Sequence, residues 1–501
     1  MKLMKVKILD MDAGGKTVAI INKRDAVEFG LHPLERMIIK KGTKEITVII
    51  DTTEKFVKSG EIGIYEEVKK QLKLKSGDIV VAKPRPELAS KDFIRKKIDN
   101  NELCYNEMRT IVNDVIERNL NDLEMAAFIT ALHIHGMTID ENIAFSKAMI
   151  DSGKKIKFHG KVVDKHSIGG VPGDKTSLLL VPIVAAAGLT IPKSSSRSIT
   201  SPAGTADRAE IIMPVDLNVE QIKNVVKKTG GCLVWGGALD LAPADDLFIQ
   251  IEKPLGMDPL VLPSVMSKKK SVGAKYVVID IPLGKEAKVK TKDEAEKLAR
   301  NFVELGRSLK MKVDCVLTRG SQPLGHTMGP ALEAREALQT IQNPETATDL
   351  VDKVTSLAGT LFSMTGKKGG KKLAYDILKS GRAERKLRDI IKAQGGNPKI
   401  QPDDIKYGKE SKVIRARKHG VVTKISNHNL ASVAKAAGAP KDKLAGILLH
   451  KKIGSYVKSG EPLYTIYAES KIKMKEALEL FDKNAVVISN GKKMMTIEKI
   501  D

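Results

Sequence analysis

The segment from Asp164 to Ser177 gathers the side chains best suited to holding an anion. It reads Asp-Lys-His-Ser-Ile-Gly-Gly-Val-Pro-Gly-Asp-Lys-Thr-Ser, between an apolar run and an expected apolar helix that begins at about Asp174. Glycines let backbone N–H groups converge on an anion, and the N-terminus of the helix adds a partial positive charge. Lys165, Ser167 and Ser177 add a fixed charge and hydroxyl donors. The segment therefore predicts a phosphate site, although its spacing is neither that of a Walker loop nor that of a dinucleotide fingerprint.

A second segment, from Ser194 to Asp207, is rich in hydroxyl groups and reads Ser-Ser-Ser-Arg-Ser-Ile-Thr-Ser-Pro-Ala-Gly-Thr-Ala-Asp. In order and spacing, the two segments together resemble the signature of the thymidine phosphorylase family of glycosyltransferases. The inserted Pro172 and the altered second segment resemble one subgroup of that family, the archaeal phosphorylases of AMP and other nucleoside 5′-monophosphates. The resemblance extends over almost the whole chain.

The resemblance assigns roles to residues of both segments. It implies that one set holds the reactive phosphate, namely Lys165, Ser167, Ser177, Ser195 and Thr205. It implies that a second set contacts the nucleotide, namely His166, Gly170, Ser196, Arg197, Ser198, Ile199, Thr200, Ser201, Thr205, Ser264 and Lys268. Hydrogen bonds to a charged group contribute roughly 1.5–3 kcal/mol each, so five donors would hold a phosphate firmly.

The base side departs from thymidine phosphorylases. Their Arg in a Leu-Arg-Asp segment is replaced here by Ile251-Glu-Lys-Pro-Leu-Gly-Met-Asp258-Pro. In the subgroup an aspartate in this Asp-Pro context is the expected proton donor to the base, which assigns that role to Asp258. Such a donor needs a carboxyl pKa raised toward neutrality. The alternative interpretation of Asp258 is a surface residue that starts a turn, and the chain is shorter than other members between Asp258 and Ser264.

A nucleotide substrate also needs a second anion site for its 5′-phosphate. Lys288, which follows an expected strand, is the first candidate, and the alternative is a solvated lysine among Lys285 and Lys290. The three cysteines are widely spaced and form no Cys/His cluster, so no metal and no cofactor is expected. Inorganic phosphate is the expected co-substrate.

The elements that must position these residues indicate a multi-domain α/β fold. The expected parts are a β-rich, double-psi-like domain at 1–86, an α-helical domain at 87–158 joined by part of 240–272, an α/β phosphate- and nucleotide-binding domain at 159–410, and a C-terminal α+β domain of the phosphorylase type at 411–501. Within the first domain, residues 29–37 echo residues 72–80, and each copy predicts a short helix, a turn and a strand.

Local signals place several further elements. Asn121-x-x-Glu124 and Thr138-x-x-Glu141 are capping boxes that predict helix starts, with stops at Gly136 and near Gly153. Apolar runs at 277–281 and 313–317 predict buried strands of an α/β sheet.

Composition limits the class of protein. The 501 residues are 42% hydrophobic and only 4% aromatic, and the net charge is +24. The basic residues are dispersed, which favours solvated surface or the steering of anionic small substrates over nucleic-acid binding. The longest apolar stretch, 178–192, is too short and too interrupted to span a bilayer, and no apolar signal region is present, so we expect a cytoplasmic enzyme.

The expected reaction is phosphorolysis of AMP to adenine and ribose 1,5-bisphosphate, with CMP and UMP as other substrates, by direct displacement with inversion. The resemblance implies a homodimer as the minimum assembly, with no nucleic-acid or membrane partner. A pyrimidine-nucleoside phosphorylase that acts on thymidine or uridine is the close alternative. A phosphoribosyl pyrophosphate transferase would share the architecture but needs a Mg²⁺-binding acidic pair, which the sequence does not reveal. A basic nucleic-acid-binding protein is the alternative from another class.

Overall fold

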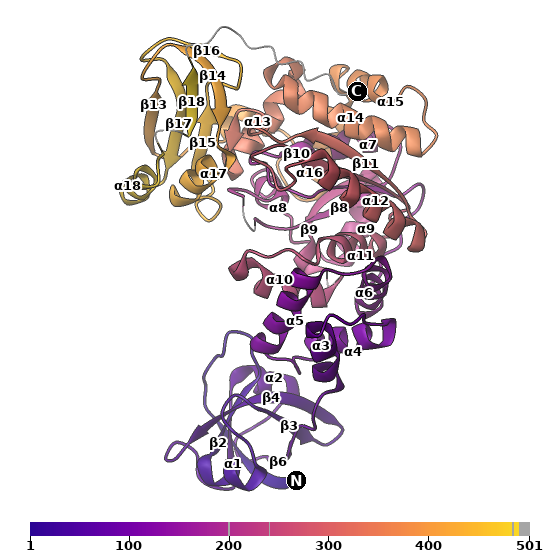
Figure 1. Ribbon diagram of the computed structural model, residues 1–501, viewed down its shortest axis with the longest axis vertical. Helices are drawn as coiled ribbons and strands as arrows, with labels where there is room; N and C mark the ends of the chain where they lie inside the picture. Colours follow the sequence, from indigo (N-terminus) through magenta and orange to yellow (C-terminus); the bar gives the residue numbers. More distant parts are fainter. Residues whose placement is uncertain (199–200, 240, 483–484, 490–501) are drawn as a thin grey trace. The chain divides into compact units, whose positions relative to one another are not determined.

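The structure is a computed structural model that describes residues 1–198, 201–239, 241–482 and 485–489 (Figure 1). The chain forms two compact units, residues 1–137 with 247–257, and residues 138–246 with 258–501. The bounds of the four expected domains stay predictions.

The N-terminal part is a closed barrel of six strands. Its order is β1 (Lys2–Ile8), β5 (Glu61–Ile64), β2 (Val18–Asn22), β4 (Lys44–Thr53), β3 (Arg36–Lys41) and β6 (Ile79–Pro84). The predicted repeat is confirmed, because α1 (Lys23–Phe29) and α2 (Glu66–Leu72) occupy equivalent places between β2 and β3 and between β5 and β6. Both helices end in the left-handed conformation, at Gly30 and at Lys73.

Helices follow the barrel. In the first unit these are α3 (Ala89–Ile98), α4 (Tyr105–Ile116), α5 (Asp122–His135) and most of α10 (Pro243–Leu255). The predicted start and stop of α5 are confirmed: Asn121 accepts a hydrogen bond from Glu124 N, its own N–H donates to Glu124, and Gly136 is the C-cap. In the second unit α6 (Ile139–Ser152) begins after the predicted cap Thr138 and ends at Gly153, and it packs against α11 (Val261–Ser271).

Parallel strands form the centre of the second unit. β7 (Val163–Ser167) pairs with β10 (Tyr276–Leu283), which pairs with β11 (Lys312–Arg319), so strands occur at both predicted positions. The prediction of burial is confirmed for β10 and is wrong for β11, an edge strand in which only Val313 is buried. β8 (Ile191–Ser195) pairs with β9 (Gly231–Trp235), and a bridge between Val162 and Thr190 links the two groups. Because the strands are parallel, the carboxyl ends of β7, β8 and β10 share one edge, where ligands of open α/β sheets bind.

Helices cover both faces of these strands. The remaining helices of this region are α7 (Thr176–Ala186), α8 (Thr205–Ala209), α9 (Val219–Thr229), α12 (Lys292–Ser308), α13 (Pro330–Gln342), α14 (Thr348–Met364), α15 (Gly370–Lys379) and α16 (Arg382–Ala393). Val278 packs into an apolar cluster with α7, α13, α14, α15 and α16, whereas Val277 and Ile279 pack into a second cluster with α9, α11 and α12. This alternation is what a strand buried on both faces requires.

The C-terminal part has its own apolar core between short strands and two helices. Its elements are β13 (Glu410–Arg415), β14 (Gly420–Ile425), α17 (Asn427–Ala436), β15 (Gly446–Leu449), β16 (Tyr456–Val457), β17 (Pro462–Ala468), α18 (Lys471–Glu479) and β18 (Val486–Ser489). They form the sheets β12-β15-β17-β13 and β16-β14-β18. The first sheet includes β12 (Thr327–Met328), which comes from the segment before α13, so the C-terminal part is joined to the α/β part by strand pairing.

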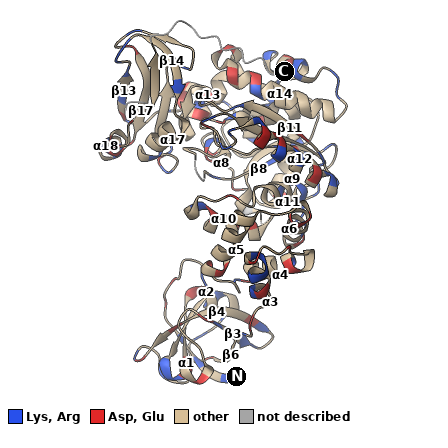
Figure 2. Cartoon of the chain, in the orientation of Figure 1, with Lys and Arg blue, Asp and Glu red and all other residues tan. Residues whose placement is uncertain are grey.

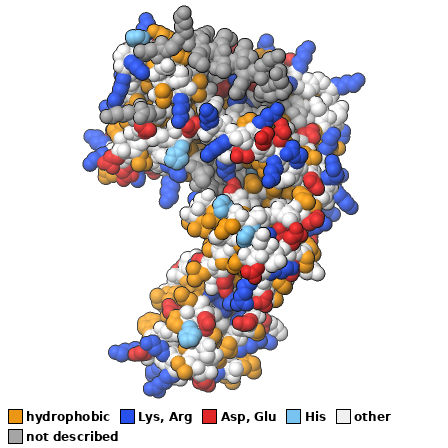
Figure 3. Space-filling model, viewed as in Figure 1, with side chains coloured by type: hydrophobic (Ala, Val, Ile, Leu, Met, Phe, Trp, Pro, Cys, Tyr) orange, Lys and Arg blue, Asp and Glu red, His pale blue; other side chains and the backbone are white. Residues whose placement is uncertain are grey.

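Charged side chains are dispersed over the molecule. Lys and Arg occur along the elements of both units and alternate with Asp and Glu (Figure 2). On the face shown in Figure 3, basic, acidic and apolar side chains are likewise interspersed. None of the helices in the described part of the chain is long and apolar enough to cross a membrane.

Candidate active site

A buried group of charges surrounds Lys165 at the carboxyl end of β7. The Lys165 ammonium lies 3.6 Å from Asp174 and 3.8 Å from Asp280, and its side chain is 4% exposed. Asp280 also pairs with Lys353 of α14 at 2.7 Å and accepts a hydrogen bond from Thr318 at 2.6 Å. The distances from the Lys165 ammonium to these two carboxylates exceed hydrogen-bond length, so neither carboxylate accepts a hydrogen bond from it.

Asp164 organises a second buried group beside the first. It pairs with Lys269 of α11 at 2.8 Å and lies 3.7 Å from Lys193 of β8. Burial lowers the pKa of Lys193 well below its usual range, and the nearby ammonium groups of Lys269 and Lys165 lower it further, against the opposite effect of Asp164.

The two groups together contain one more lysine than aspartate. They comprise the four lysines Lys165, Lys193, Lys269 and Lys353 and the three aspartates Asp164, Asp174 and Asp280. A buried charge without a counter-ion is strongly unfavourable. The missing negative charge is compensated either by loss of the Lys193 proton or by a bound anion. A phosphate is an anion of the required kind.

The glycines of the first segment have the conformation that the sequence indicates. Gly169, Gly170 and Gly173 all have φ between 79° and 90°. A Cβ atom at Gly173 would lie 2.6 Å from Leu324 O, and one at Gly170 would lie 2.7 Å from Lys288 N. The loop is therefore packed closely on both sides. The helix that follows, α7, begins at Thr176, two residues after the expected start, with Ser177 buried in its first turn.

His166 follows Lys165 and is half-buried. Burial lowers its pKa well below the usual range, and the positive charges of Lys269, Lys193, Lys165 and Lys268 lower it further. The imidazole is therefore neutral at physiological pH. A neutral imidazole can both donate and accept a hydrogen bond.

The second segment forms a loop that acidic residues hold in place. Asp207 accepts hydrogen bonds from Ser198 N at 2.7 Å and from Gly204 N at 2.8 Å. Arg197 makes a two-pronged contact with Glu210, at 2.7 and 2.8 Å, and its guanidinium lies over the ring of Trp235. The hydrogen bonds from Arg197 to Glu210 raise the pKa of the guanidinium. In this structure the guanidinium of Arg197 is thus engaged by protein groups.

The other predicted residues of this segment have varied surroundings. Ser195 ends β8 and donates to Val234 O at 3.2 Å, Ser196 is exposed, and Ser201 donates to Ala203 O at 2.9 Å. Thr205 is the first residue of α8. The predicted Ile199 and Thr200 lie outside the described residues.

Ser264 and Lys268 lie one turn apart on α11. The Lys268 ammonium contacts Asp245 and lies 3.6 Å from Asp246, both in the first turn of α10. Burial alone would lower the pKa of Lys268, but the two carboxylates raise it above its usual value. Lys268 is therefore a fixed cation on the side of the site where the sequence places the base.

Asp258 and Lys288 are paired with one another. Asp258 lies between α10 and α11, Lys288 lies between β10 and α12, and their charged atoms are 2.5 Å apart. The side chains are 47% and 42% exposed. The backbone of Lys288 also abuts Gly170, so the loop that carries Lys288 is in contact with the glycine loop at 169–173. The structure thereby brings together three features that are far apart in the sequence.

Sequence reasoning missed the buried partners of Lys165. Lys193, Lys269, Lys353 and Asp280 were not among the candidate residues. A signal existed for Asp280, because it interrupts the apolar run 277–281 of a buried strand, where a charge needs partners. Among the described residues, no group of three or more His, Cys, Asp or Glu side chains could hold a metal ion.

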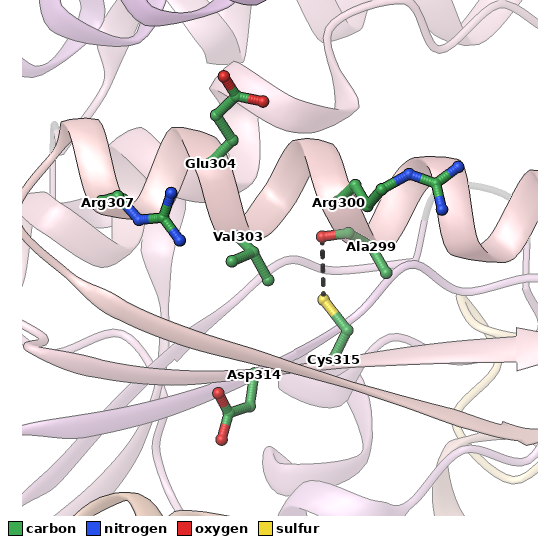
Figure 4. Close-up of a pocket in the computed structure, with 7 residues that line it drawn as sticks. All are labelled: Ala299, Arg300, Val303, Glu304, Arg307, Asp314 and Cys315. Atoms are coloured by element: carbon green, nitrogen blue, oxygen red, sulfur yellow. Dashed lines mark hydrogen bonds between the residues drawn. The ribbon is translucent and has the colours of Figure 1, made fainter.

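A separate pocket lies between α12 and β11 (Figure 4). It is lined by Ala299, Arg300, Val303, Glu304, Arg307, Asp314 and Cys315, and the thiol of Cys315 donates to Ala299 O. None of the predicted site residues lines it.

Comparison with known proteins first defines the class. Residues 159–384 match the model of the glycosyl transferase family a/b domain, and residues 91–153 match the helical bundle domain of the same family. Residues 421–488 match the pyrimidine nucleoside phosphorylase C-terminal domain. The crystal structure of anthranilate phosphoribosyltransferase from Thermus thermophilus shares the fold, with a TM-score of 0.52 and 20% identity over 60% of this chain and 99% of that chain. These matches confirm the predicted fold class, a multi-domain glycosyltransferase with a phosphorylase-type C-terminal domain.

Relatives that match this chain over its full length identify the family more specifically. The AMP phosphorylases of Methanococcus vannielii and Pyrococcus furiosus are each 45% identical to this chain, over 100% and 99% of it and 99% of each relative. That of Methanocaldococcus jannaschii is 46% identical over 96% of both chains. The chain belongs to the AMP phosphorylase family, as the resemblance of segments 164–177 and 194–207 implies.

Proposed function

We propose that this enzyme is a pentosyltransferase that cleaves AMP with inorganic phosphate, giving adenine and ribose 1,5-bisphosphate. CMP and UMP are further proposed substrates. The proposal is supported by the full-length similarity to AMP phosphorylases. The observation that carries it is the excess of buried lysines over aspartates beneath the glycine loop, with a further cation, Lys288, packed against the same loop.

The reacting phosphate is proposed to bind at the glycine loop. Lys165 supplies an ammonium group there, and Ser167, Ser177, Ser195 and Thr205 supply hydroxyl groups. The backbone of Gly169 and Gly170 and the N-terminal turn of α7 add further donors. A fixed set of donors in a water-poor site holds the phosphate in place for attack.

The bond exchange balances without a further reactant. A phosphate oxygen forms a bond to the anomeric carbon while the bond from that carbon to the base breaks, with inversion. The base leaves with the bonding electrons and takes a proton from Asp258. The phosphate releases one proton as its ester forms, and a proton taken up from solvent restores the Asp258 carboxyl, so the overall proton count is unchanged. Ser264, Lys268 and neutral His166 are proposed to contact the base, and Lys288 the 5′-phosphate. No cofactor takes part in this scheme, and a chelator added to the assay tests that point.

The first test is release of adenine from AMP, with adenosine, uridine and thymidine assayed in parallel, each with and without phosphate. Phosphate-dependent release from AMP and not from adenosine is the expected result. Cleavage of uridine or thymidine would instead identify a pyrimidine-nucleoside phosphorylase and would remove the 5′-phosphate site. CMP and UMP in the same assay define the range of bases.

We also propose a cytoplasmic location and a homodimer or larger homo-oligomer. The molar mass in solution, measured by light scattering, tests the oligomeric state, and a monomer would contradict it. Binding of a random oligonucleotide that persists at physiological salt and is not displaced by AMP would favour the nucleic-acid alternative.

A further inference from the structure

The loop that carries Lys288 is tightly held on the side away from the glycine loop. It runs from Gly284 to Val289 and closes on itself, because Gly284 N donates to Val289 O at 3.1 Å. Ala287 is 7% exposed, and a Cβ atom at Gly320 would lie only 2.7 Å from Ala287 Cβ. The loop therefore packs directly on the residue that follows β11.

One side chain of the C-terminal part ties these two segments together. Asn427 is the first residue of α17 and is 2% exposed. Its Nδ2 donates to Glu286 O at 3.2 Å and to Gly320 O at 2.9 Å. Since only the NH₂ side of an amide can face two carbonyl oxygens, the orientation of this side chain is determined by its partners.

The carboxylate of Glu286 adds further contacts with the same element. It accepts a hydrogen bond from Ser426 Oγ, the N-cap of α17, at 3.2 Å, and it pairs with Lys424 at 3.1 Å. The Glu286 side chain is 15% exposed, and a carboxylate near the N-terminus of a helix is favourably placed. Glu286, which lies two positions before Lys288, is thus anchored to the C-terminal part.

The opposite side of the loop contacts Gly170. A Cβ atom there would lie 2.7 Å from Lys288 N and 3.0 Å from Lys288 Cγ. The two loops are in direct contact. The position of Lys288 relative to the glycine loop therefore depends on the contacts that the Lys288 loop makes with Gly320 and Asn427. A displacement of about 1 Å in a substrate-positioning group can lower the rate by about 100-fold.

We propose that Asn427 is a positioning residue for recognition of the 5′-phosphate. From the C-terminal part it sets the place of Lys288 against the glycine loop, through its bonds to Glu286 and Gly320. The inference rests on the proposed role of Lys288. By this role of Asn427, the C-terminal part contributes to the selectivity for AMP through the loop from Gly284 to Val289.

The test compares Asn427→Ala with Asn429→Ala. Asn429 lies on the same helix, and its amide donates to Leu480 O at 3.0 Å, within the C-terminal part. Asn427→Ala removes both hydrogen bonds and should raise the KM for AMP about three- to tenfold, as expected for a weakened contact between Lys288 and the 5′-phosphate. The inhibition constant of adenosine and the KM for phosphate should stay within about twofold, and Asn429→Ala should change none of these values.

A double variant makes the test specific. In a Lys288→Met background, Asn427→Ala should have no further effect on the KM for AMP, because residues that act through one another are not additive. If Asn427→Ala does not fold, Glu286→Gln, which removes the charge pair with Lys424 and keeps the side-chain shape, should raise the KM for AMP in the same selective way.

The outcomes separate this inference from the proposed function. Equal losses for AMP and adenosine, no loss at all, or a full effect of Asn427→Ala in the Lys288→Met background would overturn it. If the wild-type enzyme does not prefer AMP to adenosine, the proposed function fails. If Lys288→Met removes that preference and Asn427→Ala leaves it intact, the present inference alone fails.

Discussion

The ammonium group of Lys288 lies against the carboxylate of Asp258, so the proposed ligand of the 5′-phosphate is paired with the proposed donor of the proton. Both side chains are more than 40% exposed, and exposed ion pairs contribute little stability. A phosphate dianion can therefore compete for Lys288. When it does, the carboxylate of Asp258 loses the cation with which it is paired in this structure.

Lys288→Met tests whether Lys288 binds the 5′-phosphate. The variant should raise the KM for AMP by about 10- to 100-fold, as expected for loss of a hydrogen bond to a charged group. Binding of adenosine should be unchanged, because adenosine has no 5′-phosphate to contact Lys288. Lys285→Met, on the same loop, is the matched control and should behave as wild type. Equal losses for AMP and adenosine would show that Lys288 does not hold the 5′-phosphate.

Asp258→Asn tests the proton donor. The amide keeps the shape of the side chain and cannot supply the proton, so kcat with AMP should fall by about 10²–10⁴. The KM for phosphate should change little, because the glycine loop is intact. Asp293→Asn, in the first turn of α12, serves as the control. Turnover close to wild type would leave Asp258 as a residue that starts a turn.

Lys353→Met tests the buried charges under the glycine loop. Removal of one partner of a buried pair leaves Asp280 without its nearest cation and should lower the free energy of unfolding by up to about 3–5 kcal/mol. The KM for phosphate should also rise, because Asp280 then attracts the ammonium of Lys165. Thermal unfolding and phosphate kinetics are the measurements. Adding Asp280→Asn should restore part of the stability, and a double variant as unstable as the sum of the single ones would contradict the pairing.

Glu210 predicts a dependence of stability on pH. Hydrogen bonds from Arg197 and Lys443 lower the pKa of this carboxyl to about 2. A carboxylate with a lowered pKa stabilises the fold fully above its unfolded value, near pH 4.5, and this contribution is lost as the pH falls toward 2. Glu210→Gln should therefore lower stability by about 1–2 kcal/mol at pH 7, after allowance for partial exposure.

The melting temperatures of wild type and Glu210→Gln, measured from pH 7 to pH 3, give the check. The two curves should lie apart at pH 7 and approach one another below pH 4.5. If the difference in melting temperature stays constant over this range, the carboxylate of Glu210 does not stabilise the fold through its pairing with Arg197 and Lys443.

The local elements of this protein were predictable because their determinants lie within a few residues of one another. The capping boxes at Asn121 and Thr138 place the starts of α5 and α6, and the glycines at 136 and 153 place their ends. The apolar run at 277–281 identifies β10, and the repeat in the first 86 residues identifies equivalent helices in the barrel. The glycines at 169–173 require left-handed backbone, which their identity alone indicates.

The partners of the charged side chains could not be predicted in this way. Lys and Arg together number 85, and nothing in their type distinguishes a solvated lysine from the buried Lys193, Lys269 or Lys353. Burial and pairing depend on which helix packs over which strand, and those elements are distant in the chain.

By itself, then, the sequence determined the family, the glycine loop and the residue types available for phosphate and nucleotide. Only the tertiary structure decided that Lys288 pairs with Asp258, that Arg197 pairs with Glu210, and that Asn427 supports the Lys288 loop. The physical reason is that local conformation is set by neighbours in sequence, whereas electrostatic partners are set by packing between elements that fold together.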